Sequence, residues 1–250
     1  MRVDLNADLG ETVDGMPTAD DDAMFAVISS ANVACGGHAG DAASMRASVE
    51  RAVRYGVAVG AHPSYDDREN FGRVARSPEP AELRASVTAQ LSALVAAGAD
   101  LRYVKPHGAL YHAVTADPRQ AQAVAAAVAD QSDRLGRALP ILGLSGAIVE
   151  AAASAGLPFV REAFLDRGYT PQGGLVPRGE PGDLVHDPGA VADRALRLVR
   201  DGEVDTVEGA HVAVDAASLC LHGDTPAAVA MARAVRASLD GAGIEVRAPW

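Results

Sequence analysis

The sequence has 250 residues and a formal net charge of −11, from 22 Lys and Arg against 33 Asp and Glu. This length suits one α/β barrel or doubly wound domain, and we expect a single domain over residues 1–250. Because the net charge is negative, we expect neither nucleic acid nor anionic lipid as a partner. No apolar run approaches the roughly 18 residues of a membrane span, and the first residues leave no room for a signal peptide. We therefore expect a cytoplasmic protein with no membrane partner.

Short apolar runs alternate along the chain with stretches of helical period, which is typical of βαβ units and a parallel sheet. Strands are predicted at residues 2–8, 30–35, 57–62, 102–106, 140–143, 158–162 and 217–222, with a short one at 244–246. Helical faces are clearest over 42–53 and 83–95, and two later helices are predicted to open at Asp187 and Asp224. Seven strand–helix units favour a single-domain, irregular seven-stranded β/α barrel over an open sheet.

Two long irregular stretches, 63–80 and 168–186, interrupt this alternation. The second is rich in glycine and proline. Loops of this length in a small domain often cover a site, although a plain surface loop is the alternative. We expect a lid or rim loop.

Polar side chains gather where the predicted strands end, which is where barrel enzymes place their active sites. We expect one pocket lined by Asp8, His38, His62, Lys105, His107, Glu162 and His222. Catalytic roles are predicted for Asp8, His62, Lys105, His107 and Glu162. Substrate-binding roles are predicted for Asn6, Glu11, Asn32, His38, Asp41, Asp166, Arg167, His222 and Asp224.

Such a cluster supports two kinds of chemistry. Imidazoles and carboxylates can ligate a divalent metal, for which Asp8, His38, His62 and His107 are the candidates. Alternatively, a carboxylate or His acts as a general base while Lys105 and Arg167 hold negative charge. The sequence has no HExxH, GxxxxGK[ST] or GxSxG motif to decide between them.

Lys105 is the sole lysine among the 22 basic residues. Arginine has replaced lysine wherever a surface charge suffices, so this position calls for a compact ammonium rather than a planar guanidinium. We expect Lys105 to contact an anionic group, which is a phosphate, the substrate carboxylate or an oxyanion.

Taken together, several motifs resemble those of the LamB/YcsF family. They are VDLNADLGE at 3–11, SANVACGGHAGD at 30–41, GVAVGAHPSYDDRENFGR at 56–73, VKPHGALY at 104–111, EAFLDRGYTPQGGLVPR at 162–178 and CLHGD at 220–224. The motifs extend over nearly the whole chain, and their joint order and spacing make the resemblance specific.

The resemblance implies a β/α barrel similar to the glycoside hydrolase/deacetylase type. It also implies a 5-oxoprolinase reaction, in which 5-oxo-L-proline is opened to L-glutamate as ATP becomes ADP and phosphate. ATP, with Mg²⁺, is the implied cofactor, and subunits B and C of such an enzyme are the implied partners. Two alternatives stay open: a metal-dependent carbohydrate deacetylase, and a non-catalytic substrate-binding subunit.

Overall fold

A computed structural model describes residues 1–223 and 227–250, in which parallel strands close into a seven-stranded barrel. Each strand pairs with the next along the chain, and the first pairs with the last, Asp8 opposite His222. The barrel strands are β1 (Arg2–Leu9), β4 (Ser30–Ala34), β5 (Ala58–His62), β6 (Leu101–Val104), β7 (Ile141–Gly143), β8 (Phe159–Phe164) and β11 (Ser218–His222). The prediction of a closed seven-stranded barrel is confirmed.

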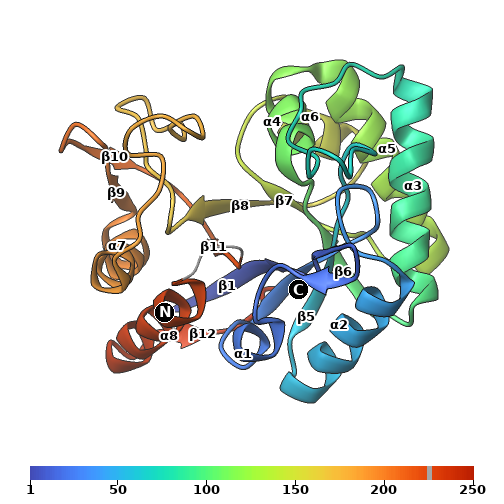
Figure 1. Ribbon diagram of the computed structural model, residues 1–250. Helices are drawn as coiled ribbons and strands as arrows, with labels where there is room; N and C mark the ends of the chain where they lie inside the picture. The colour runs from blue at the N-terminus through green and yellow to red at the C-terminus, as the bar shows by residue number, and fades with distance from the viewer. Residues whose placement is uncertain (224–226) are drawn as a thin grey trace.

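Helices surround the barrel, with α3, α5 and α6 on one side and α7 and α8 on the opposite side (Figure 1). They are α1 (Asp21–Phe25), α2 (Ala42–Tyr55), α3 (Pro80–Ala96), α4 (Gly108–Ala116), α5 (Pro118–Leu135), α6 (Ala147–Ser154), α7 (Pro188–Asp201) and α8 (Ala228–Gly241). Among the described helices, none has the length and apolar character needed to cross a membrane.

The predicted strands agree with the observed ones to within two residues at each end. Two smaller pairings were not predicted: the hairpin of β2 (Thr12–Val13) and β3 (Met16–Pro17), and the pair β9 (Glu203–Asp205) and β10 (His211–Ala213). Helices α1, α4, α5 and α6 were not predicted either. The short strand predicted at 244–246 is β12 (Glu245–Val246), which pairs with the start of β1. The predicted helix start at Asp224 lies outside the described residues.

The barrel interior is polar because β1 alternates two kinds of residue. Its apolar residues, Leu5 and Leu9 among them, belong to the hydrophobic core shared with the helices. The intervening Asp4, Asn6 and Asp8 contact polar side chains of other barrel strands. Successive side chains of a strand point to opposite faces, so β1 sends its polar series into the barrel.

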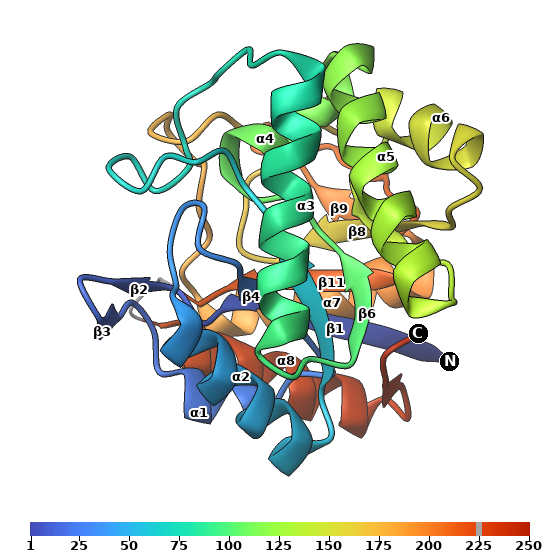
Figure 2. The same cartoon turned by 90° about the vertical axis from the view of Figure 1, so that its right-hand side faces the viewer.

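Both long loops lie at the carboxyl end of the strands. In Figure 2 the chain termini lie on the right, while the β2–β3 hairpin and the loop that follows β5 lie on the left. At the opposite end, the Trp250 ring stacks on Tyr103 at 4.1 Å between centroids, and its Nε1 donates to Ser30 Oγ. The base of the barrel is thus packed with side chains, and the open end is the one that carries the predicted site residues.

Candidate active site

A cavity of about 470 Å³ opens at the carboxyl end of the barrel. Its volume lies in the range of small-molecule sites. Its polar and aromatic wall consists of Asp8, Glu11, His62, Arg73, Lys105, His107, Tyr111, His112, Phe164, Arg167, Arg178 and His222. Of the seven residues expected to line one pocket, five do so. The other two lie directly behind the wall: His38 stacks on His107, and Glu162 contacts Lys105.

Lys105 is almost fully buried directly after β6, and its ammonium lies between two carboxylates. Nζ lies 3.0 Å from Glu162 Oε2 and 3.3 Å from Asp8 Oδ1, and it also donates to Asn6 Oδ1 at 3.2 Å. Burial alone would lower the pKa of Lys105, but the charges of Asp8 and Glu162 outweigh it and raise the pKa well above its usual value. Lys105 is therefore charged at neutral pH.

Glu162 lies on β8, behind the lysine and off the cavity wall. Its carboxylate accepts hydrogen bonds from Asn6 Nδ2 at 3.3 Å and from the Tyr111 hydroxyl at 2.8 Å, besides its ion pair with Lys105. In this position Glu162 orients and neutralises the ammonium rather than facing the cavity.

The two oxygens of Asp8 have different surroundings. Oδ1 accepts hydrogen bonds from Asn32 Nδ2 at 2.7 Å and from Lys105 Nζ at 3.3 Å, while Oδ2 faces His62 Nε2 at 3.3 Å. Burial would raise the pKa of Asp8, but His62 and Lys105 outweigh it and hold the pKa well below its usual value. Asp8 is thus an ionised carboxylate with one oxygen turned to the histidines.

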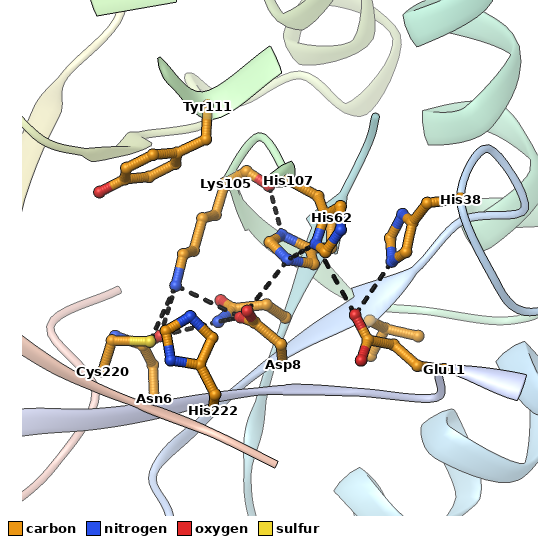
Figure 3. Close-up of polar contacts among 12 residues, drawn as sticks. Asn6, Asp8, Glu11, His38, His62, Lys105, His107, Tyr111, Cys220 and His222 are labelled. Atoms are coloured by element: carbon orange, nitrogen blue, oxygen red, sulfur yellow. Dashed lines mark hydrogen bonds and ion pairs between the residues drawn. The ribbon is translucent and has the colours of Figure 1, made fainter. Parts of the chain in front are cut away.

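His62 and His107 face each other, and each uses its outer nitrogen on a backbone carbonyl (Figure 3). His62 Nδ1 lies 2.7 Å from the Lys105 carbonyl, and His107 Nε2 lies 3.0 Å from the Phe71 carbonyl. A carbonyl accepts only, so both of these nitrogens carry hydrogen. The inner atoms, His62 Nε2 and His107 Nδ1, are 3.0 Å apart.

His38 backs this pair from the loop after β4. Its ring stacks on His107 at 3.6 Å between centroids, and its Nε2 lies 3.0 Å from Glu11 Oε1. Burial, followed by neighbouring histidines, lowers the pKa of both His38 and His107 well below the usual value. Both rings are neutral at pH 7.

His222 forms a second charged unit on the cavity wall. Its Nδ1 lies 2.9 Å from Asp166 Oδ2, and its backbone N–H donates to the same carboxylate. Burial disfavours the charged imidazole, but the Asp166 carboxylate outweighs it and raises the pKa of His222. Asp166 therefore acts on the cavity through His222.

The remaining predicted substrate-binding residues take other positions. Asn6 and Asn32 lie inside the barrel beneath the cavity, and Asp41 is exposed where it caps α2. Arg167 reaches the wall, but its guanidinium donates to the carbonyls of Asp183 and Val176 and so braces the 168–186 loop. Asp224 lies outside the described residues.

Five wall residues were not predicted: Arg73, Tyr111, His112, Phe164 and Arg178. The two arginines come from the long irregular loops, where no strand end marks a position. The one indication in the sequence was that the two long loops were expected to form a lid or rim over the site. Residues 175–178 of the second loop line the cavity, which supports that interpretation.

Comparison with known protein families supports the resemblance that the sequence motifs indicated, and it does so along nearly the whole chain. The model of the LamB/YcsF family matches residues 3–249. The chain belongs to this family. It is 52% identical to the 5-oxoprolinase A subunit of Streptomyces griseus, over 98% of this chain and 99% of that one. It is 49% identical to the 5-oxoprolinase A subunit of Paracidovorax citrulli, over 99% of each chain.

A solved structure of a family relative has the same fold. The crystal structure of the lactam utilization protein from Thermus thermophilus is 43% identical, with a TM-score of 0.91 over 99% of this chain and all of that one. The resemblance found in the sequence motifs is confirmed, and so is the barrel that it implied.

Proposed function

We propose that the chain is the A subunit of an ATP-dependent 5-oxoprolinase, which opens 5-oxo-L-proline to L-glutamate as ATP is hydrolysed to ADP and phosphate. The names of the full-length relatives support this proposal. The observation that carries it is a small cavity where one buried ammonium, Lys105, lies beside Asp8, His62 and His107. The proposed location is the cytoplasm, where ATP is available.

The chemistry of a lactam calls for these groups. A five-membered lactam is an unstrained amide that resists water, and its carbonyl oxygen gains negative charge as water attacks. The Lys105 ammonium stabilises that oxygen, and the cluster of Asp8, His62 and His107 activates the water. ATP supplies the driving force by phosphorylating the lactam oxygen, with ADP as the leaving group. Water then attacks the ring carbon, and the C–N bond breaks as the ring nitrogen takes up a proton. A second water hydrolyses the resulting acyl phosphate to the glutamate carboxylate and phosphate.

The substrate carboxylate needs a cation other than Lys105. Arg167 was one candidate, but its guanidinium is engaged by backbone carbonyls. Arg178 is exposed on the cavity wall, further along the same loop region. We assign carboxylate binding to Arg178, since guanidinium–carboxylate pairs are strong and directional.

The sequence has no phosphate-binding loop of the GxxxxGK[ST] type. The proposal therefore gives nucleotide binding, with Mg²⁺, to the assembly with subunits B and C. Glutamate release from 5-oxoproline is measured for the chain alone and with both partners, with and without ATP and Mg²⁺. We expect turnover only in the complete mixture.

The other possible results of this experiment distinguish the alternatives. Strong ATP-coupled turnover by the isolated chain would show that the partner requirement is wrong. No glutamate from the complete, assembled mixture would contradict the function itself, and acetate release from an acetylated oligosaccharide would support the deacetylase alternative. Full activity of assembled Asp8→Asn and His107→Gln variants would favour a non-catalytic binding role.

A further inference from the structure

We propose that His62 Nε2, His107 Nδ1 and Asp8 Oδ2 form a binding site for one divalent metal ion, with Zn²⁺ as the preferred occupant. We call these three residues the triad. The inference does not depend on the proposed function, because it is tested by metal binding without substrate.

The contacts of the outer nitrogens decide which atoms of the triad can ligate. The Nε2–H of His107 is engaged by the Phe71 carbonyl, so Nδ1 is the ring nitrogen left to ligate. The Nδ1–H of His62 is engaged by the Lys105 carbonyl, so Nε2 is the ring nitrogen that faces Asp8 and His107. These two atoms lie 3.0 Å apart, and Asp8 Oδ2 lies 3.3 Å from the second. Three atoms of the kind that ligate metals thus converge, all within 4.8 Å of one another.

A proton on His62 Nε2 would satisfy only part of this arrangement. One N–H can point to His107 Nδ1 or to Asp8 Oδ2, and the other acceptor stays unmatched. Glu11 Oε1 adds further negative charge 3.7 Å from His107 Nδ1. A metal ion accepts all three lone pairs at once and neutralises the charge.

The distances also suit a metal. With Zn–N and Zn–O bonds of about 2.0–2.1 Å, the edges of a tetrahedron are about 3.3–3.4 Å. The triad has edges of 3.0 and 3.3 Å, so a small outward movement admits the ion. Two imidazoles and one carboxylate favour Zn²⁺ over Mg²⁺, and three protein ligands leave a position open to the cavity.

The atoms around the triad hold it in the form that binds metal. Metal-ligating histidines usually donate their other N–H to a carbonyl or carboxylate, as both triad histidines do here. The two oxygens of Asp8 are likewise used differently. Asn32 and Lys105 donate hydrogen bonds to Oδ1, which leaves Oδ2 for the ion. Lys105 therefore contacts Asp8 without competing for the ligand oxygen.

A second grouping, formed by Glu11, His38 and His107, is the alternative site. The hydrogen bond between His38 and Glu11 argues against it. His38 Nε2 lies 3.0 Å from Glu11 Oε1, and because a carboxylate accepts, this nitrogen carries the hydrogen and is not free to ligate. Its Nδ1 is buried with no hydrogen-bond partner among the described residues and lies on the far side of the ring. We therefore assign the site to the triad.

The test is metal binding by the full-length chain. The protein is stripped with a chelator, and Zn²⁺ binding is measured by equilibrium dialysis with metal analysis. Co²⁺ is then used as a spectroscopic probe. We expect one Zn²⁺ per chain, and intense visible absorption from four-coordinate Co²⁺ that Zn²⁺ displaces. No bound Zn²⁺ at low-micromolar free metal would overturn the proposal, without need of any variant.

Variants locate the ion while keeping the carbonyl hydrogen bonds. Asn at position 62 can still donate to the Lys105 carbonyl, and Gln at 107 can still donate to the Phe71 carbonyl. His62→Asn and His107→Gln should each weaken Zn²⁺ binding by at least about 100-fold, since even outer partners contribute 10–100-fold. His38 stacks on His107 but its hydrogen bond goes to Glu11, so His38→Gln should weaken binding by less than about tenfold, the lower limit for an outer partner.

A surface control completes the set. His211 is exposed and lies 2.9 Å from Asp205, so it is a histidine–carboxylate pair away from the cavity. His211→Gln should bind Zn²⁺ as the unchanged protein does. Loss of binding in His211→Gln, or in His38→Gln but not in His62→Asn, would refute the assignment. Circular dichroism and thermal unfolding confirm that each variant is folded.

Discussion

The Lys105 ammonium lies 3.0 Å from the Glu162 carboxylate, and both side chains are almost completely buried. A buried charge with one partner removed is strongly destabilising, so the pair holds the ammonium at one position at the base of the cavity. That position has room for a compact ammonium on a flexible side chain. A guanidinium needs more room and a planar partner.

We therefore expect Lys105→Arg to fail nearly as badly as Lys105→Met. Loss of a contact made mainly in the transition state costs about 2–4 kcal/mol, or about 10²–10³ in rate. The measurement is ATP-dependent glutamate release by the assembled enzyme, with thermal unfolding as the check on folding. An assembled Lys105→Arg variant that keeps more than about a third of normal turnover would show that the ammonium has no special role.

Gly72 provides a test of how closely the loop after β5 packs on the histidines. Its φ is +67°, and a Cβ there would lie 2.9 Å from His38 Cβ and 3.1 Å from His107 Cδ2. Gly72→Ala should displace His107 and lower turnover at least about tenfold, because small shifts in a reacting group are costly.

Gly56→Ala is the matched control for backbone strain. Gly56 has nearly the same φ, +69°, but nothing lies within 4 Å of the added Cβ. It should lose stability of about 1 kcal/mol with normal turnover. Equal losses of activity in the two variants would show that strain, rather than displacement of His107, is responsible.

Arg178→Gln should raise the KM for 5-oxoproline more than it lowers kcat, because the proposed contact is to the substrate carboxylate. A hydrogen bond to a charged group is worth about 1.5–3 kcal/mol, or about 10–150-fold in kcat/KM. Arg161→Gln is the control, since Arg161 is a half-exposed residue 3.8 Å from Asp215 and off the cavity wall. A change confined to kcat would contradict the assignment.

Asp4 predicts a pH dependence of stability. Burial raises its pKa from 3.8 to about 6 against the hydrogen bonds from Ser218, Ser29 and Ser30. The folded protein therefore binds this proton more tightly than the unfolded chain. The resulting stability is fully present below pH 3.8 and is lost as pH rises through about 6. The change amounts to about 3 kcal/mol.

Asp4→Asn stays neutral throughout, so its free energy of unfolding should fall less between pH 4 and 6 than that of the unchanged protein. Urea unfolding at pH 4, 5, 6 and 7 measures this, and the difference in slope should vanish above about pH 6.5. The three neighbouring hydroxyls can rotate to suit an amide. Parallel curves for the two proteins would mean that Asp4 is not the group responsible.

The strands were predictable from sequence because each is a short run bounded by turn residues. The helix α5 was not, since alanine is both apolar and a strong helix former. In Pro118–Leu135 buried alanines recur at every second position, from Ala121 to Ala127, which obscures the spacing of three or four that marks a helix. Closure of the barrel depends on the pairing of Asp8 with His222, which lie near opposite ends of the sequence, and no local pattern encodes it.

The sequence predicted at which end of the strands the site lies. It did not predict which of the side chains there reach the cavity. Lys105, His62 and His107 lie on the cavity wall as expected. Arg167 follows β8 as a strand-end cation should, yet backbone carbonyls of its own loop bind its guanidinium. Such contacts depend on the path of the 168–186 loop, which periodicity does not specify.

The pairing of the first barrel strand with the last has a consequence for biosynthesis. β1 leaves the ribosome first and can pair with β4 early, but its other edge has no partner until Ser218–His222 has been made. Until β11 is made the sheet is open, and between the synthesis of β8 and that of β11 its unpaired edges are β1 and β8, which invite association with other chains. The cavity between Asp8 and His222 is therefore completed only after β11 has been made, and a chain that stops between β8 and β11 has two exposed edges and no finished site.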